Sequence, residues 1–359
     1  MILNINAPIN TTSYGYVSCN LIKELKKLAV DIRHIPIGIN SPDISILPEI
    51  QDVLSRWDYD HHSPCLKIWH QHDLNAFYGK GLRIGMPIFE LEKFNKKELH
   101  SLQNPDRLFV CSKWAKNVIE SEVPNSIGYT DVIPLGVDSN IFKPFPMPIA
   151  EKTIFANFGK WEARKGHNEL PEIFNKAFEK DDDVLLIMMP SNPFLNQNET
   201  NEWIKKYKNT KLADKIFFIN RQEKHEMVYN IMSQIHCGVF PSRAEGWNLE
   251  ALELLSIGRH IIITNSTAHT EFCNNRNSYL VNMESGYEPA IDHKFFNGDF
   301  NWRKIGESEI DQFVEHMRMI HKKRKDGTLL LNEEGIKTGA KYNWKNTAKL
   351  LIENIYGQI

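Results

Sequence analysis

The sequence lacks long apolar runs, paired cysteines and a large net charge. No stretch approaches the ~20 apolar residues that span a bilayer, and the start, MILNINAPIN, lacks the basic and then apolar pattern of a signal peptide, so we expect a cytoplasmic protein. The cysteines are odd in number and never form a Cys-x-x-Cys pair, which argues against a disulfide framework and a zinc site; they are Cys19, Cys65, Cys111, Cys237 and Cys273. A formal net charge of −2 argues against a globally basic nucleic-acid binder.

Length and composition indicate two globular domains. The chain has 359 residues, of which 42% are hydrophobic and 25% are charged, and such a length suits two α/β domains of roughly 150 to 200 residues each. Apolar strand-like stretches alternate with amphipathic ones in both halves. In the first half, the pattern predicts strands at residues 1–7, 66–70, 107–111 and 131–133, and helices at 17–28 and 113–121. Such alternation is typical of parallel sheets covered by helices.

A proline-rich stretch separates the two halves. Residues 142–148 read Phe-Lys-Pro-Phe-Pro-Met-Pro, and three prolines in seven residues disfavour both helix and central strand, so this stretch is interpreted as a linker. Beyond it, the pattern predicts strands at residues 153–158, 184–189, 216–219, 237–240 and 260–264, and helices at 168–178, 224–232 and 249–257. Residues 343–356 form a further amphipathic helical pattern at the C-terminus.

The strongest chemical signal is the segment from Pro241 to Gly258, which predicts a strand end, a loop of small residues and then a helix. Backbone N–H groups around Gly246, Trp247 and Asn248 would lie at the helix start, where the helix dipole favours an anion such as a diphosphate. Glu245 precedes this helix and Glu253 lies about two turns inside it. One carboxylate could therefore face a sugar while the other reaches a ribose hydroxyl. For Glu250, a solvated first-turn acid is the favoured interpretation.

A second signal follows the first predicted strand of the second domain, in the segment Phe158-Gly-Lys-Trp-Glu-Ala-Arg-Lys-Gly-His167. Gly159 permits close backbone approach, and Lys160 and Lys165 supply point charges for a leaving diphosphate. Basic loop residues are more often solvated surface charges. This segment therefore gains weight only together with the downstream glutamates.

These motifs make the chain resemble the retaining family 4 glycosyltransferases of the GT-B fold. The family pattern of two glutamates eight residues apart is met by Glu245 and Glu253, and its Gly-basic…Lys-Gly loop by Gly159, Lys160, Lys165 and Gly166. Residues 132–138, Val-Ile-Pro-Leu-Gly-Val-Asp, resemble the family segment that leads into the interdomain linker. The resemblance implies two Rossmann-like domains with parallel sheets and a cleft between them. It divides the chain into an acceptor-side domain at 1–145, a nucleotide-sugar domain at 146–338 and a helix at 339–359 that crosses back to the first.

The resemblance also implies residue roles. Lys160 and Lys165 would bind the donor phosphates, Glu245 would contact the transferred sugar and Glu253 would hold the ribose. The leaving diphosphate would help to deprotonate the acceptor on the same face, with no obligatory metal or other cofactor. Asn248 stands where the family usually has a glycine, and residues 266–271 lack the glycines that normally precede the next glutamate, Glu271.

The first domain offers acceptor-side candidates. Gly15 lies in a glycine loop after the first strand and is a candidate donor-binding residue that could face the donor across the cleft; the resemblance implies that this loop also helps to form the acceptor side, and an ordinary turn is an equal alternative. His70 and His72 lie at the end of a predicted strand, where alternation would point both side chains to one side, and they are the best acceptor-side candidates, with a zinc half-site or a buried histidine as alternatives. Asp58-Tyr-Asp60 imitates the Asp-x-Asp metal motif of the other large glycosyltransferase fold but is interpreted as a polar loop.

The predicted activity is sugar transfer, hexosyl or pentosyl, from a nucleoside diphosphate sugar to an unidentified acceptor, with retention of configuration. A nucleotide-sugar epimerase, a phosphorylase or a catalytically silent nucleotide-sugar binder on the same architecture are the alternatives. The acceptor could be a glycan, lipid, protein or nucleic acid. Two basic clusters, at residues 93–97 and 322–325, could contact a membrane surface or a polyanion, although such clusters usually only keep a surface solvated. Neither the donor's base and sugar nor the oligomeric state follows from the sequence.

Overall fold

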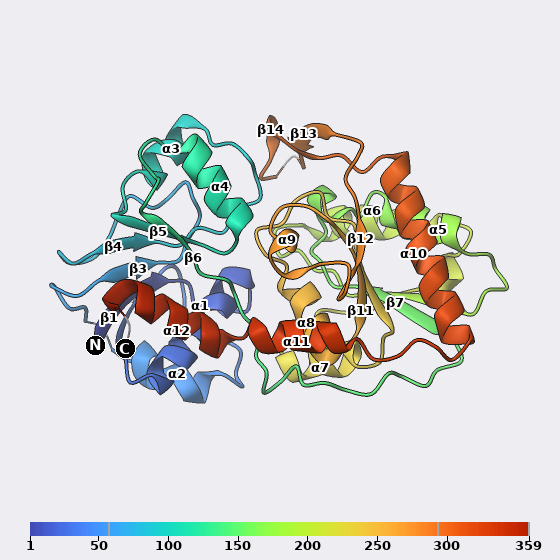
Figure 1. Cartoon of the computed structure of the whole chain (residues 1–359), viewed down its shortest axis with the longest axis horizontal. Helices are drawn as coiled ribbons and strands as arrows, with labels where there is room; N and C mark the ends of the chain where they lie inside the picture. The colour runs from blue at the N-terminus through green and yellow to red at the C-terminus, as the bar shows by residue number, and fades with distance from the viewer. Residues whose placement is uncertain (57, 293, 358–359) are drawn as a thin grey trace. The chain divides into compact units, whose positions relative to one another are not determined.

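The computed structural model describes residues 1–56, 58–292 and 294–357 and divides the chain into two compact units. The first contains Met1–Asp138 and the segment from Lys341 onward, and the second contains Ser139–Ala340. Each unit is built on a six-stranded sheet in which all neighbouring strands are parallel (Figure 1). The predicted α/β class with two parallel sheets is therefore confirmed.

The sheet of the first unit has the strand order β2-β1-β3-β4-β5-β6. Its strands are β1 (Ile2–Ala7), β2 (Asp31–Pro36), β3 (Cys65–Lys67), β4 (Arg83–Gly85), β5 (Arg107–Val110) and β6 (Thr130–Val132). Its helices are α1 (Ser13–Lys27), α2 (Leu47–Leu54), α3 (Lys96–Leu102), α4 (Lys113–Glu122) and the C-terminal α12 (Trp344–Tyr356). Ser112 caps α4 as its position predicts, because its hydroxyl accepts a hydrogen bond from Ala115 N–H at 3.1 Å.

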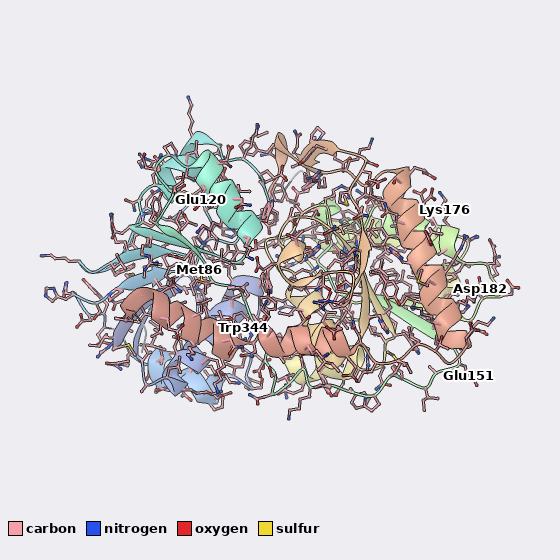
Figure 2. The ribbon with its side chains drawn as sticks, in the orientation of Figure 1. Met86, Glu120, Glu151, Lys176, Asp182 and Trp344 are labelled. Carbon is pink, nitrogen blue, oxygen red and sulfur yellow. The ribbon has the colours of Figure 1, made fainter. Side chains whose placement is uncertain are left out.

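Helix α12 closes the first unit by packing against α1. The Trp344 ring lies edge-on to Tyr16 of α1, with ring centroids 6.2 Å apart (Figure 2 labels Trp344). The Tyr356 hydroxyl at the other end of α12 donates to the carbonyl of Ile2 at 2.5 Å. A segment more than 300 residues from β1 in sequence therefore completes the same core.

The sheet of the second unit has the strand order β12-β11-β10-β7-β8-β9. Its strands are β7 (Thr153–Asn157), β8 (Val184–Met188), β9 (Ile216–Phe218), β10 (Cys237–Phe240), β11 (His260–Thr264) and β12 (Tyr279–Val281), and a separate antiparallel hairpin joins β13 (Tyr287–Ile291) to β14 (Asn297–Arg303). Its helical elements are η1 (Ala163–Lys165), α5 (Leu170–Ala177), α6 (Gln197–Lys208), η2 (Ala213–Lys215), α7 (His225–Met232), α8 (Leu249–Ile257), α9 (His269–Phe272), α10 (Glu307–Lys325) and α11 (Glu333–Lys341).

Buried apolar side chains explain why these strands are central. β10 is buried along its whole length, and Phe155 of β7 joins Leu186 and Met188 of β8 in one hydrophobic core. Helix α8 packs closely on β10, because a Cβ added at Gly238 would lie 2.5 Å from Leu254 Cδ1. Lys176 of α5 lies beside α10 (Figure 2), with its Nζ 3.0 Å from Asp311 Oδ1.

The proline-rich linker belongs to the second unit. Arg259 is fully buried, and its guanidinium donates to the carbonyls of Phe145 at 3.0 Å, Pro146 at 2.8 Å and Ser233 at 2.8 Å. The compact second unit therefore begins at Ser139, because these bonds tie the linker to it, and the predicted domain limit at residue 145 stays a prediction. At the other end, the first unit resumes at Lys341.

Several predicted elements have different limits. Helix α1 begins at Ser13 rather than Val17, so Gly15 lies in its first turn and not in a loop. Strand β3 ends at Lys67 rather than at His70. The remaining predicted strands and helices agree to within two residues. The elements that were not predicted are β2, β4, β12, the hairpin, α2, α3, α6, α9, α10, α11, η1 and η2. All five cysteines are free and buried, as expected.

The helices of the described residues include none that is both long and apolar enough to cross a membrane. Two cations of the basic cluster at residues 322–325 have partners within the second unit. Lys323 donates to the Tyr279 hydroxyl at 3.0 Å, and Arg324 donates to Thr153 Oγ1 at 2.9 Å. These bonds fix the end of α10 to the sheet, and a membrane contact at this cluster stays a prediction.

Candidate functional site

Two loops of the second unit meet at one edge of its sheet. Strands β7 and β10 are parallel neighbours, with Phe155 opposite Cys237. Their carboxyl ends, and the loops that follow them at residues 158–166 and 241–248, therefore lie side by side. A hydrogen bond of 2.8 Å from the N–H of Arg243 to the carbonyl of Arg164 joins the two loops. The two segments that carried the sequence prediction are thus brought together.

Glu245 is the centre of a buried ion-pair network between these loops. Its Oε1 lies 2.7 Å from Lys165 Nζ and accepts the Ser242 hydroxyl at 2.9 Å. Its Oε2 lies 2.9 Å from Nη1 of Arg164. The other terminal nitrogen of the same guanidinium, Nη2, lies 2.7 Å from Glu162 Oε2. All four charged side chains are buried. Both carboxylate oxygens are therefore held by cations; Oε1 has two partners, and Oε2 keeps a second lone pair.

The charges in this network set its protonation. Burial alone would raise the pKa of Glu245, but the neighbouring Lys165 and Arg164 charges overcome it and hold that pKa far below its usual value. Burial would lower the pKa of Lys165, but Glu245 and then Glu250 raise it above its usual value. With Lys160 and Glu162, the loops hold three cations and two carboxylates in this network, which leaves one excess positive charge suited to an anion.

Two glycines make this approach possible. Gly166 has a φ of +76°, and a Cβ at that position would lie 1.9 Å from the carbonyl oxygen of Pro241. Gly159 leaves room for the side chain of Lys165, because a Cβ at position 159 would lie only 3.2 Å from Lys165 Cδ. Both glycines were singled out by sequence, and the structure gives them a packing role in bringing Lys165 to Glu245.

Two residues other than glycine adopt left-handed backbone conformations beside Glu245. Asn248 has a φ of +85°, caps α8 through its Oδ1 to Ala251 N–H at 3.2 Å and donates its amide to His269 Nε2 at 3.0 Å. Thr267 has a φ of +48°, and its hydroxyl accepts the Glu245 N–H at 3.0 Å. Such conformations cost about 1–3 kcal/mol each, and hydrogen bonds to the site offset that cost. Asn248 therefore keeps a backbone conformation that favours glycine.

The other predicted donor residues differ in accessibility. Lys160 is the most open cation of its loop, with 33% of its side chain exposed and its Nζ 4.0 Å from Glu162 Oε1. Glu253 is buried within α8, and Gly246 is buried next to Glu245. Trp247 packs against Phe272 with ring centroids 5.0 Å apart. Its indole is therefore a core group, and any donor contact from this residue is left to its backbone.

The first-unit candidates lie beyond the carboxyl ends of β1 and β3. His70 and His72 stack with ring centroids 5.3 Å apart and an interplanar angle of 16°. They share one side because of the turn after β3 and not because of strand alternation, since the strand ends at Lys67. Tyr14 of α1 lies 4.7 Å from the His70 ring. Gly15 is buried where an added Cβ would lie within 2.4 Å of the Asn10 backbone, which is a packing reason for glycine.

Sequence reasoning missed four polar contributors to the second-unit site: Arg164, Ser242, Thr267 and His269. Arg164 makes two contacts to the Glu245 segment where Lys165 makes one, because it also donates to the carbonyl of Ala244 at 2.7 Å. The adjacent Arg-Lys pair before Gly166 was a signal for it. Nothing in the local sequence marked Thr267 or His269, which reach Glu245 and Asn248 only through the fold. Within the described part of the chain, no group of three or more His, Cys, Asp or Glu side chains is arranged to hold a metal ion.

The buried His269 makes the free energy of unfolding depend on pH. Its Nδ1–H donates to the carbonyl of Thr264 at 2.9 Å while its Nε2 accepts from Asn248, and burial lowers its pKa to about 4. The unfolded chain therefore binds a proton more readily between about pH 6.5 and 4, so stability falls as the pH falls through that window. Between pH 7.5 and 5.5 this histidine should lower the free energy of unfolding by roughly 1 kcal/mol.

Urea unfolding of the protein and of a His269→Gln variant at the two pH values measures this contribution. The variant should lose roughly 1 kcal/mol less than the parent protein. Equal losses in the two proteins would show that His269 is not buried in its neutral form.

Comparison with known proteins matches the segment that contains these residues. Residues 140–285 match the family model described as glycosyl transferases group 1, and this segment contains Lys160, Lys165, Glu245 and Glu253. A search of curated proteins found no match.

Solved structures match almost the whole chain at low sequence identity. A glycosyltransferase from Rickettsia africae is 14% identical with a TM-score of 0.71, over 99% of this chain and 97% of that one. Anabaena Alr3699/HepE in complex with UDP-glucose is 12% identical with a TM-score of 0.70, over 99% of both chains. Sucrose-phosphate synthase from Thermosynechococcus elongatus is 14% identical with a TM-score of 0.68, over 99% and 98%. With the two parallel six-stranded sheets, these likenesses identify the GT-B fold that the sequence predicted.

Proposed function

We propose that this protein is a glycosyltransferase that moves a sugar from a nucleoside diphosphate sugar to an acceptor hydroxyl, with retention of configuration. The observation that carries the proposal is the Glu245 carboxylate held between Lys165 and Arg164 beside the start of α8. That arrangement lies in the segment that matches glycosyl transferases group 1. The HepE neighbour is a complex with UDP-glucose, which supports a nucleotide-sugar donor here.

The second unit would hold the donor. Lys160 and Lys165 bind the diphosphate, together with the positive end of α8. Glu245 uses the remaining lone pair of its Oε2 to accept a hydroxyl of the transferred sugar, and Glu253 holds the ribose. Arg164 positions Glu245 and keeps it ionised, because the pair is buried and only 2.9 Å apart. On this assignment most charges of the network are paired, which keeps the buried groups stable, and the one excess positive charge attracts the diphosphate.

In the proposed reaction, the bond between the anomeric carbon and the β-phosphate oxygen breaks, and its electron pair leaves with the diphosphate. The acceptor oxygen bonds to the anomeric carbon on the same face, and its proton passes to an oxygen of the departing diphosphate. The lysine charges stabilise that leaving group, so no side-chain nucleophile or metal is required. In the first unit, we assign His72, stacked on His70, to the acceptor side.

Donor binding and turnover test the proposal separately. A panel of nucleoside diphosphate sugars is first screened by thermal unfolding, because a ligand at 100 times its Kd stabilises the folded state by about 2.7 kcal/mol. The stabilising donor is then incubated with candidate acceptors, both with and without a chelator. Release of nucleoside diphosphate and the anomeric configuration of the product are measured by NMR. We expect one donor to stabilise the protein. With this donor, the product glycoside should retain the anomeric configuration of the donor sugar, both with and without the chelator.

Each alternative gives its own result in this experiment. An epimerase would convert the donor without an acceptor, and a phosphorylase would require phosphate to release the sugar. Binding without turnover would indicate a silent nucleotide-sugar binder. An inverted product, or the absence of stabilisation by every donor, would contradict the proposal.

A further inference from the structure

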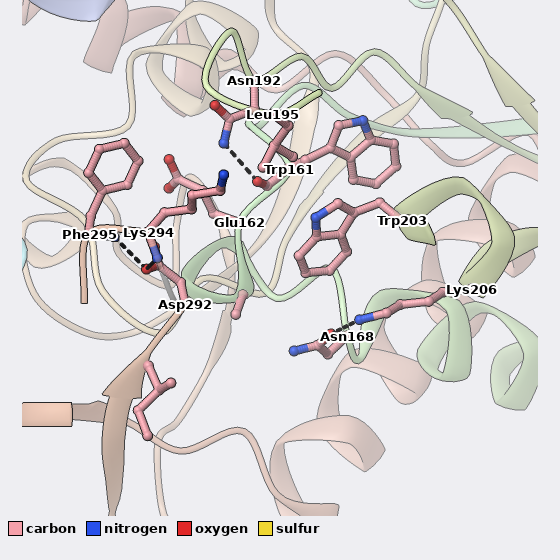
Figure 3. A pocket seen from close by; sticks show the side chains of 12 residues that line it. Trp161, Glu162, Asn168, Asn192, Leu195, Trp203, Lys206, Asp292, Lys294 and Phe295 are labelled. Carbon is pink, nitrogen blue, oxygen red and sulfur yellow. Dashed lines mark hydrogen bonds between the residues drawn. The ribbon is translucent and has the colours of Figure 1, made fainter. Parts of the chain in front are cut away.

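A pocket of about 290 Å³ lies in the second unit, beside the loop at residues 158–166 (Figure 3). Its walls come from the loop after β7, the loop before α6, α6 itself and the tip of the β13–β14 hairpin. Lys165, Glu245 and Glu253 do not line it. Its volume is near the lower end of the range for small-molecule sites, ~300 Å³.

Aromatic rings form the apolar part of the pocket. Trp161 and Trp203 stack in parallel, with ring centroids 6.0 Å apart and an interplanar angle of 11°. Phe295 on the hairpin lies at the rim with 52% of its surface exposed, and it packs edge-on against the exposed Phe194 at 5.2 Å. Exposed aromatic rings beside a pocket favour a ligand with an apolar face, because their negative faces attract polarised C–H groups.

The polar groups of the pocket include both donors and acceptors. The Asn168 amide uses its Oδ1 to accept Lys206 Nζ, and its Nδ2 has no acceptor among the described residues. The Trp203 indole N–H has none there either. Among the described residues, Asp292 accepts through Oδ1, from the N–H groups of residues 294, 295 and 296, and not through Oδ2. Glu162 uses Oε2 for Arg164, while its Oε1 lies 4.0 Å from Lys160 Nζ. Two N–H donors and two carboxylate oxygens therefore remain for a ligand.

The charges of the pocket favour a neutral ligand. Its two lysines, Lys206 and Lys294, are balanced in number by Glu162 and Asp292. Each lysine is also engaged, since Lys206 lies 4.0 Å from the Trp203 ring centroid and Lys294 Nζ is 2.7 Å from Glu199 Oε1. An anion would find no unengaged cation among these residues, and a cation would face two ammonium groups. A neutral molecule with hydroxyls around its edge and C–H groups on its faces matches all of these features.

We infer that this pocket binds the ring of a neutral saccharide, separately from the nucleotide-sugar donor. Hydroxyls would donate to the free oxygens of Glu162 and Asp292 and accept from Trp203 and Asn168, while C–H faces pack on the aromatic rim. Glu162 also holds Arg164, which holds Glu245, so an occupied pocket would touch the residue that positions the donor network. The saccharide could be free or one unit of a glycan.

Saturation-transfer NMR with methyl α-D-glucoside, methyl α-D-galactoside and methyl α-D-mannoside tests the inference in the full-length protein. At least one should bind with a Kd on the order of 1 mM, as expected for a ligand of this size, and should still bind with excess UDP present. Trp203→Ala should weaken binding about 10-fold or more, and Asn168→Ala about 5-fold. Lys205→Ala is the matched control on the same helix, because Lys205 does not line the pocket, is 63% exposed and pairs with Glu202. It should bind like the parent.

The outcomes separate the pocket from the donor site. Maltotriose binding more tightly than the methyl glucoside would indicate a glycan chain, and equal affinity a free sugar. Both would support the inference. No binding of any neutral sugar, unchanged binding in both Trp203→Ala and Asn168→Ala, or displacement of the sugar by inorganic phosphate would overturn it. None of these readouts requires transferase activity, so the proposed function can fail while the pocket is confirmed.

Discussion

Replacing Glu245 by glutamine is expected to lower the rate of sugar transfer by about 100-fold or more. The change keeps the shape of the side chain but removes the charge that aligns Lys165 and Arg164, and preorganised charges of this kind typically contribute a factor of ~10² to 10³. Steady-state release of nucleoside diphosphate measures the loss. Glu172→Gln, at an exposed carboxylate in the first turn of α5, makes the same change in net charge and should keep full activity.

The same substitution should also destabilise the protein, which requires a second control. Removing one partner of a buried ion pair costs about 3–5 kcal/mol, because the remaining charge is left uncompensated. The double variant Lys165→Met with Glu245→Gln removes both charges of the 2.7 Å pair. It should recover much of the lost stability while staying inactive, since neutral replacement of a buried pair is often tolerated.

Urea unfolding and activity measurements on the four proteins of this cycle separate the two effects. If Glu245→Gln retains the parent rate, or if the double variant regains activity along with stability, Glu245 and Lys165 act only as a structural pair and the proposed donor site is wrong.

The second large effect is expected at Gly166. Alanine there should lower the free energy of unfolding by about 3 kcal/mol or more. The left-handed φ of +76° costs about 1–2 kcal/mol for a residue with a Cβ, and that Cβ would lie 1.9 Å from the main-chain oxygen of Pro241. The two loops would have to separate, and the hydrogen bond from Arg243 N–H to the Arg164 carbonyl would be lost.

Gly327→Ala is the matched control for the backbone term. Gly327 has a φ of +69°, and an added Cβ meets no atom within 4 Å, so only the conformational cost of about 1–2 kcal/mol applies. Urea unfolding compares the two variants with the parent. Equal losses in Gly166→Ala and Gly327→Ala would mean that the close approach of the two loops is absent in solution.

The sequence by itself determined the α/β class, the two halves and the pair of loops that carry the candidate site. Periodicity identified most strands of both sheets, because a buried parallel strand is a short apolar run that needs no distant information. The resemblance of residues 158–166 and 241–258 to family motifs then selected Lys160, Lys165, Glu245 and Glu253. Local pattern also placed α8 at its observed limits, Leu249–Ile257.

Only the tertiary structure decided which of these residues meet and what surrounds them. Glu245 is bonded to Arg164, 81 positions away, and to Thr267 in the loop after β11, and no local pattern encodes such contacts. The unit boundary depends on the distant Arg259, and the saccharide pocket depends on α6 and a hairpin that the sequence did not predict. The physical reason is that burial and ion pairing are set by packing between segments far apart in the chain, whereas helix and strand periodicity are properties of neighbouring residues.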